Sequence, residues 1–274
     1  MTPQDDSQTL GQDAKRVKES PAEAAGVHKA IREGGEKELS RTASALFWSA
    51  VAAGLSISFS MVTMGLLRAH LPDTEVAFLV ECFGYTVGFL VIGLAKQQLF
   101  TENTLTAVLP IMTSPNFTNL AKMLRLWVVV LIGNLVGVAV FAYAIQALPI
   151  LDPKTHEAFV SLGEDVLINT KGEMFAKGIV AGWIIATMVW LMPAADQAKI
   201  WVIIIMTYLV ALGEFTHIIV GSTEILFLVF DGQASWSEYL FHFMFPVLAG
   251  NVIGGTFIFA LISHAQIRSD KPPR

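Results

Sequence analysis

Six long apolar stretches constrain this chain more than any other feature of its sequence. The hydrocarbon core of a bilayer is about 30 Å thick and needs about 20 apolar residues per helical crossing. Four stretches have that length, but the second covers 36 residues and the fifth 32, too long for one helix and too short for two. The stretches lie at about residues 45–67, 77–112, 122–147, 174–193, 199–230 and 239–263. The sequence therefore predicts an all-α polytopic membrane protein with six transmembrane helices, of which the second and fifth are broken.

The composition agrees with a membrane protein. Hydrophobic residues make up 54% of the 274 residues and charged residues only 15%, which is unusual for a soluble domain. The single cysteine, Cys82, excludes an intrachain disulfide framework. The expected environment is the lipid bilayer, and no nucleic-acid partner is expected. The polar start lacks the short apolar core of a secretory signal, so the first apolar stretch is expected to direct insertion.

Three regions are predicted along the chain. Residues 1–44 form a cytoplasmic leader that is largely disordered and then a short helix, which we expect to be solvated rather than to cap the pore. Residues 45–265 form the transmembrane transporter domain, and residues 266–274 a cytoplasmic tail. If the N-terminus is inside, thirteen Lys and Arg residues lie in internal segments and four outside. Cytoplasmic segments carry such an excess, so a multi-pass protein of the cell (inner) membrane with both termini cytoplasmic is predicted.

The two broken stretches occupy the same place in two consecutive halves of three crossings. An odd number of crossings per half inverts one half relative to the other. The residues Gly-Asn-Leu-Val-Gly at 133–137 in the third stretch are echoed by Gly-Asn-Val-Ile-Gly at 250–254 in the sixth. This pattern predicts inverted repeats whose discontinuous helices meet near the bilayer midplane.

Polar residues within the broken stretches indicate a transport path. Backbone that is not helical leaves N–H and C=O groups unpaired, which a bilayer tolerates only where they are buried in protein or face water. Ionisable side chains at that depth cost about 2.5–3.5 kcal/mol each and mark a path or an internal ion pair. They are Lys96, Glu102, Glu214, His217 and Glu224. His217 stands out because imidazole exchanges a proton near neutral pH, although a core histidine can also serve only as a hydrogen-bonding group.

Two motifs carry a resemblance to a known family. The residues Leu-Phe-Thr-Glu-Asn-Thr at 99–104, and the break at His217 followed by Gly-Asn-Val-Ile-Gly-Gly at 250–255, resemble the formate/nitrite transporter family over about residues 45–265. The Lys-Gln-Gln at 96–98 is similar to a divergent branch of that family with a cytoplasmic leader and no settled substrate. The resemblance implies an aquaporin-like fold that assembles as a homopentamer with a separate pore in each subunit.

The resemblance also implies roles for single residues. The loop that breaks the second crossing would line the cytoplasmic-side constriction through Leu99, Phe100 and Thr101. His217 would be the central histidine of the pore. The family's asparagine of the sixth crossing matches Asn251, and a lysine that draws anions into the outer vestibule has Lys171 as its nearest match.

Several positions depart from the family pattern. The acidic residue that adjoins the central histidine in typical members is Thr216 here, with Glu214 three positions before His217. Polar residues expected in the fifth and fourth crossings are replaced by Gly221 and Gly182. Because Lys96 also adds a positive charge, the selectivity of typical members cannot be carried over to this chain.

These features predict a channel-like transporter for small monovalent anions such as formate or nitrite, or for their protonated acids. A bare carboxylate in a low-dielectric constriction faces a Born cost of tens of kcal/mol. Protonating an acid with a pKa of about 4 at pH 7 costs roughly 3 × 1.36, or about 4 kcal/mol. We therefore expect Lys96 or Lys171 to concentrate the anion, and apolar side chains such as Leu99 and Val210 to form constrictions. His217 would donate or relay the proton, or hydrogen-bond the solute.

Two alternatives remain at this stage, and an enzyme is not expected. An aquaporin-like pore for neutral solutes lacks its paired Asn-Pro-Ala motifs here. A non-transporting structural or regulatory protein would be supported if Lys96 were ion-paired to Glu102 or Glu214, whereas an open lysine would support anion recruitment. No Gly-x-Ser-x-Gly, His-Glu-x-x-His or Cys-x-x-Cys pattern is present, so no catalytic residue, cofactor or metal is predicted.

Overall fold

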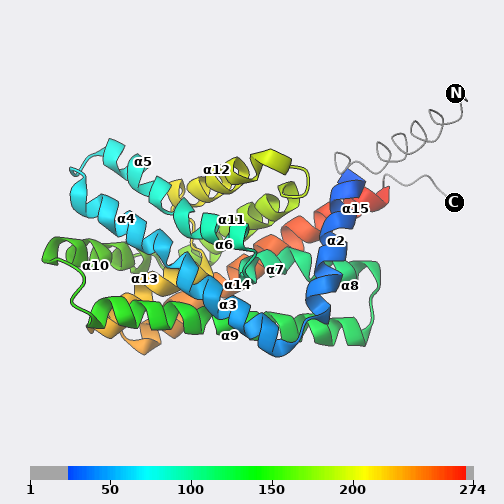
Figure 1. Ribbon diagram of the computed structural model, residues 1–274, viewed down its shortest axis with the longest axis horizontal. Helices are drawn as coiled ribbons and strands as arrows, with labels where there is room; N and C mark the ends of the chain where they lie inside the picture. Colours follow the sequence, from blue (N-terminus) through cyan, green and yellow to red (C-terminus); the bar gives the residue numbers. More distant parts are fainter. Residues whose placement is uncertain (1–23, 270–274) are drawn as a thin grey trace, which may run out of the picture.

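The computed structural model describes residues 24–269, which fold as helices joined by short connections (Figure 1). Within this range five helical segments are long and apolar enough to cross a membrane, and they correspond to the first, second, third, fourth and sixth predicted crossings. They are α3 with α4 (Ala43–Ile57, Phe59–His70), α5 with α6 (Glu75–Gly84, Thr86–Ala95), α9 (Phe117–Ala147), α11 (Lys171–Leu191), and the last segment, built from η2 (Glu238–Met244), α14 (Phe245–Val252), η3 (Ile253–Ala260) and α15 (Leu261–Ser269).

The second and fifth crossings are broken, as predicted. After α6 the chain runs without helix from Lys96 to Leu99 and then forms the short helices α7 (Phe100–Thr106) and α8 (Leu109–Thr113). The fifth crossing, which follows a short turn η1 (Asp196–Ala198), consists of α12 (Lys199–Leu212) and α13 (Ile218–Asp231). Each of these two helices has 14 residues and is about 21 Å long, so only the pair can span the bilayer.

Close helix pairs frame the two breaks in the same way. The helix α3 packs along α9, and α11 packs along α14 and η3. A Cβ atom at Gly137 would lie 2.4 Å from the carbonyl oxygen of Val51, and one at Gly254 would lie 2.0 Å from that of Ile179. No larger side chain fits at either place, which is the use that membrane helices make of glycines at four-residue spacing. The repeated Gly-Asn element thus builds the same contact in both halves.

The molecule has two distinct ends. Figure 1 shows α2 (Ala24–Ser40), α8 and α15 gathered at one end, and the α4–α5 connection with α10 (Pro153–Leu167) at the other. We call these ends the terminal side and the far side. The helix α10 lies in a loop between the third and fourth crossings, where the sequence predicted no element, and it packs against α4 and α13.

The helix α2 corrects the expectation of a solvated leader for residues 24–40. Val27, Ile31 and Leu39 are each only 5% exposed. Together with Gly35, these residues recur every fourth position and form one apolar stripe, which packs on the terminal side. Arg125 of α9 holds the end of the helix, donating a 3.1 Å hydrogen bond to the carbonyl oxygen of Leu39. The rest of the predicted leader, residues 1–23, and the last residues of the tail lie outside the described range.

Candidate functional site

Two buried asparagines hold the breaks open in matching geometry. Asn251 Oδ1 accepts from the backbone N–H of Ile218 (2.9 Å), while its Nδ2 donates to the carbonyl oxygens of Thr216 (3.0 Å) and Gly178 (2.8 Å). The amide thus satisfies the backbone groups on both sides of His217, which a membrane interior would otherwise leave unpaired. Asn251 is fully buried, so its place is behind the pore wall.

Asn134 performs the same task at the other break. Its Oδ1 accepts from the backbone N–H of Phe100 (2.9 Å), and its Nδ2 donates to the carbonyl oxygens of Gln98 and Ala50 (2.8 Å each). The bonds bracket Leu99 as those of Asn251 bracket His217. Leu99 and His217 are therefore equivalent positions, and each is the extended residue that precedes a half-helix, α7 or α13.

The centre of the molecule contains a hydrogen-bonded pair from the two breaks. His217 Nε2 lies 2.8 Å from the hydroxyl oxygen of Thr101. The backbone N–H of Val220 donates to His217 Nδ1 (3.3 Å), so the hydrogen of a neutral imidazole must be on Nε2, which donates to Thr101. The hydroxyl hydrogen of Thr101 then stays free for another acceptor. Both side chains are buried, with His217 2% and Thr101 0% exposed.

Apolar side chains surround this pair. The ring of Phe89 meets the imidazole edge to face, with centroids 5.3 Å apart. Val210 is buried beside His217 at the far side, and Leu99 is buried at the terminal side. Phe100 faces neither cavity, because its backbone is held by Asn134 and its ring packs against Trp127 with centroids 6.0 Å apart. The expected place of Phe100 in the constriction stays a prediction.

A cavity on the terminal side leads towards the breaks. It is lined by Gly34, Glu38, Ile92, Gly93, Lys96, Gln97, Gln98, Leu99, Glu102, Asn103, Thr106, Met188, Val189, Met192 and Ile203. Lys96 is exposed and has a left-handed backbone (φ 52°). It forms no ion pair within 4.0 Å with any residue in the described range, so it is not bound to Glu102 or Glu214. This cavity therefore contains an unpaired lysine together with the carboxyl groups of Glu38 and Glu102.

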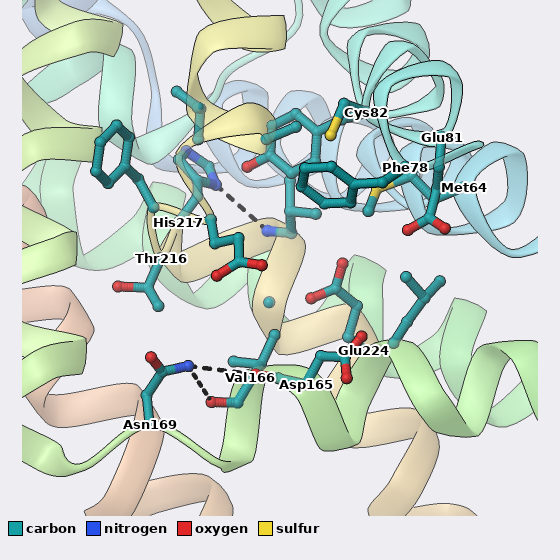
Figure 2. A pocket seen from close by; sticks show the side chains of 18 of the residues that line it. Met64, Phe78, Glu81, Cys82, Asp165, Val166, Asn169, Thr216, His217 and Glu224 are labelled. Carbon is teal, nitrogen blue, oxygen red and sulfur yellow. Dashed lines mark hydrogen bonds between the residues drawn. The ribbon is translucent and has the colours of Figure 1, made fainter. Parts of the chain in front are cut away.

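A second cavity, on the far side, reaches His217 from the opposite direction. Figure 2 shows Thr216, His217, Glu81 and Glu224 around it. It is lined by Met64, Arg68, Phe78, Glu81, Cys82, Tyr85, Leu162, Asp165, Val166, Asn169, Val210, Ala211, Glu214, Phe215, Thr216, His217, Val220, Gly221, Glu224 and Phe243. The hydroxyl of Thr216 already donates to the carbonyl oxygen of Met174 (2.8 Å), so its hydrogen is not available to a solute in the cavity.

Charged residues on the far side are mostly paired. Arg68 makes two bonds to the carboxylate of Glu81 (2.9 and 2.8 Å) and one to Asp165 (2.7 Å). Glu214 lies at a left-handed position (φ 49°), 3.7 Å from Lys177. Lys171 is exposed at the start of α11 and is not among the residues that line the far-side cavity, so the anion-drawing role implied for it stays a prediction.

Sequence reasoning missed several residues of the site. In the sequence Arg68 is one of the four Lys and Arg residues expected outside. Its place near the end of an apolar stretch, with Glu81 one crossing later, could have indicated an ion pair. Phe89 and Tyr85 lie in an apolar run, where nothing distinguishes them from packing residues. Across residues 24–269 no group of three or more His, Cys, Asp or Glu side chains could hold a metal ion.

The chain is similar to known membrane proteins. Inner membrane protein YfdC of Escherichia coli (strain K12) is 54% identical over 250 residues, which cover 91% of this chain and 81% of that protein. A probable formate transporter of Methanothermobacter thermautotrophicus is 27% identical over 234 residues, covering 77% of this chain and 84% of that protein.

Solved structures share the fold. A pentameric formate channel with formate bound superposes with a TM-score of 0.70 at 19% identity, covering 83% of this chain and 98% of that one. An FNT family ion channel gives a TM-score of 0.75 at 17% identity, covering 90% and 99%. The sequence pattern described as formate/nitrite transporter matches residues 25–265. The chain, an all-helical membrane protein with broken second and fifth crossings, therefore belongs to the formate/nitrite transporter family.

Proposed function

We propose that this protein is a channel-like transporter for small monovalent anions, such as formate or nitrite, or for their protonated acids. The observation that carries the proposal is the buried pair of His217 and Thr101, which lies between two cavities that open to opposite sides. The name of the similar YfdC supports a place in the inner membrane, and the excess of Lys and Arg supports cytoplasmic termini.

The constriction favours an uncharged solute. Phe89, Val210 and Leu99 supply no hydrogen bond that could replace the hydration shell of an ion. A carboxylate would meet a desolvation cost of tens of kcal/mol there, whereas its protonation at pH 7 costs about 4 kcal/mol for an acid with a pKa of about 4. The cheaper route is passage as the undissociated acid.

The polar groups of the pair fit such a solute. With Nε2–H of His217 given to Thr101, the free Thr101 hydroxyl hydrogen can be donated to a carboxyl or nitrite oxygen. Proton donation by the imidazole would require Nδ1 to give up the bond from the Val220 N–H, so hydrogen bonding to the solute is the role that this geometry favours. On the terminal side, Lys96 is unpaired whereas Glu38 is bound to Arg41 and Gln98, so Lys96 would attract anions against the charge of Glu102 alone.

The homopentamer predicted for the chain is part of this proposal. A solved structure with the same fold is described as a pentameric channel, and each subunit here has its own central pair and its own two cavities. Large apolar side chains such as Trp48, Val128 and Phe257 are more than half exposed and suit contact with lipid or neighbouring subunits. The unpaired state of Lys96 gives no support to a purely structural role.

The test is uptake of formate, nitrite, hydrosulfide, lactate and acetate into proteoliposomes at pH 5 and pH 8. We expect uptake that rises at low pH in the natural protein and falls at least tenfold in His217→Ala. His70→Ala is the matched control, because His70 lies exposed at the end of α4. Lys96→Ala should lower uptake from the terminal side at low solute concentration only. A His217→Ala variant with unchanged rate and pH dependence would remove the role given to the histidine.

A further inference from the structure

Two buried polar side chains of the far-side cavity have no hydrogen-bond partner among residues 24–269. Tyr85 and Glu224 both line this cavity, and each is only 5% exposed. The hydroxyl oxygen of Tyr85 is shielded from water and has no partner. The carboxyl group of Glu224, which faces the cavity, forms no hydrogen bond or ion pair with a described residue. Buried polar groups in proteins are almost always paired, so these two call for a partner that the chain does not supply.

The other groups around the cavity decide what that partner can be. The guanidinium of Arg68 is already bound to Glu81 and Asp165, and Glu214 is close to Lys177. An anion would therefore find no free cation among the described residues that line this cavity, and it would meet the carboxyl groups of Glu81, Asp165, Glu214 and Glu224. The remaining walls are mainly apolar, from Met64, Phe78, Leu162, Val166 and Phe243. Such a cavity suits a small uncharged molecule that can donate and accept hydrogen bonds.

The aromatic side chains connect this cavity to the centre. The ring of Tyr85 lies 5.3 Å from that of Phe89, and the ring of Phe89 lies 5.3 Å from the imidazole of His217. A solute bound at Tyr85 and Glu224 would therefore be one step from the pair of His217 and Thr101. Figure 2 shows Glu224, which belongs to α13, and His217 lining the same cavity.

We propose that the far-side cavity is a binding site for the undissociated form of a small monobasic acid, held by the carboxyl of Glu224 and the hydroxyl of Tyr85. A neutral carboxyl at Glu224 offers one O–H donor and one C=O acceptor, which complement the acid group of the solute. The Tyr85 hydroxyl donates a further bond. This inference rests on the proposed transport function and adds the residues that select the solute on the far side.

The experiment measures initial uptake of labelled formate at pH 5.5 into right-side-out membrane vesicles, which present the far side to the medium. Glu224→Gln keeps a donor and an acceptor without a charge, whereas Glu224→Leu removes both. Tyr85→Phe removes one oxygen from a ring that otherwise packs unchanged. Glu164→Gln is the matched control, since Glu164 lies exposed on α10 and does not line the cavity.

We expect Glu164→Gln to transport like the natural protein. Glu224→Gln should retain most of the uptake that Glu224→Leu loses, because its amide keeps a donor and an acceptor. Glu224→Leu should raise KM at least tenfold, and Tyr85→Phe should raise it about two- to tenfold, the effect of one lost hydrogen bond. Equal loss in Glu224→Gln and Glu224→Leu would show that a charge is needed and would overturn the proposal, as would unchanged KM in both Glu224→Leu and Tyr85→Phe. If Glu224→Leu does not assemble, Tyr85→Phe decides alone.

These outcomes differ from failure of the transport proposal. Absence of uptake by the natural protein for all the acids, or full uptake by His217→Ala, would contradict the transport proposal itself. Uptake that depends on His217 but is insensitive to changes at Glu224 and Tyr85 would leave that proposal standing and reject only the far-side site.

Discussion

Replacing Asn251 by alanine should destabilise the protein strongly, although the residue touches no solute. The change removes three buried hydrogen bonds, of 2.8, 2.9 and 3.0 Å. It leaves the N–H of Ile218 and the carbonyl oxygen of Thr216 without a partner, whereas the carbonyl oxygen of Gly178 keeps its bond within α11. Each unsatisfied buried group costs about 1–3 kcal/mol. The far-side cavity allows water to reach some of these groups, so we expect a loss of about 3 kcal/mol, near the lower end of the range.

The repeat supplies an internal comparison for this variant. Asn134 makes the same three kinds of bond in the other half, so Asn134→Ala should cost about as much as Asn251→Ala. Asn119 donates one 3.1 Å bond to Ser114 at the exposed start of α9 and serves as control, with an expected change below about 1 kcal/mol.

The assay is reversible unfolding in mixed micelles, followed by circular dichroism, with the oligomeric state checked by size exclusion. Asn251→Asp tests the donor role of the asparagine amide separately. The aspartate can still accept from Ile218 but presents an oxygen to the two carbonyl oxygens, so it should be no better than alanine. If the free energies of unfolding of Asn251→Ala and Asn134→Ala both lie within about 1 kcal/mol of that of the natural protein, the asparagines do not stabilise the breaks through these hydrogen bonds.

Two further predictions concern the far side. Arg68→Gln should destabilise the protein by about 3 kcal/mol, because Glu81, whose side chain is only 8% exposed, loses its partner. In the same unfolding assay, the double variant Arg68→Gln with Glu81→Gln should recover most of this loss. A double variant as unstable as Arg68→Gln alone would contradict the argument. Asp152 caps α10, and a hydrogen bond from Thr155 holds the pKa of Asp152 below its usual value of 3.8. A lowered folded-state pKa gives stability that is present above pH 3.8 and is lost as the pH falls through the folded value, so the melting temperatures of the natural protein and Asp152→Ala should converge in acid. A constant difference between pH 7 and pH 2.5 would refute this.

Much of the scaffold could be predicted from the sequence because its determinants are local or repeated. Crossing length follows from bilayer thickness, and the two overlong stretches with polar centres indicated the breaks. The Gly-Asn elements marked the inverted repeat, and the structure shows why they recur: glycine permits the close helix contact and asparagine satisfies the break. His217 and Thr101 could be placed in the breaks from sequence, but their contact could not.

Other features depend on contacts between distant segments. The stripe of Val27, Ile31, Gly35 and Leu39 is visible in the sequence, yet only the fold shows that it is buried on the terminal side. Lys171 is the nearest sequence match to the vestibule lysine, whereas Lys177, about two helical turns further along α11, is the lysine near Glu214. The free state of Tyr85 and Glu224 could not be predicted at all, because it is defined by what surrounds them.

The two breaks share a backbone conformation but carry different side chains at matched positions. Leu99 and His217 occupy equivalent positions before a half-helix, and three residues earlier Lys96 and Glu214 share a left-handed backbone, with φ of 52° and 49°. The repeat therefore gives both breaks the same backbone conformation, while the side chains differ at each matched position. Leu99 in the first repeat corresponds to His217 in the second. The unpaired Lys96 on the terminal side corresponds to Glu214, which is paired with Lys177, on the far side. Exchanging charge at these two positions, as in Lys96→Glu, should change how the solute enters while leaving the backbone of the break intact, because the left-handed conformation already accepts both side chains.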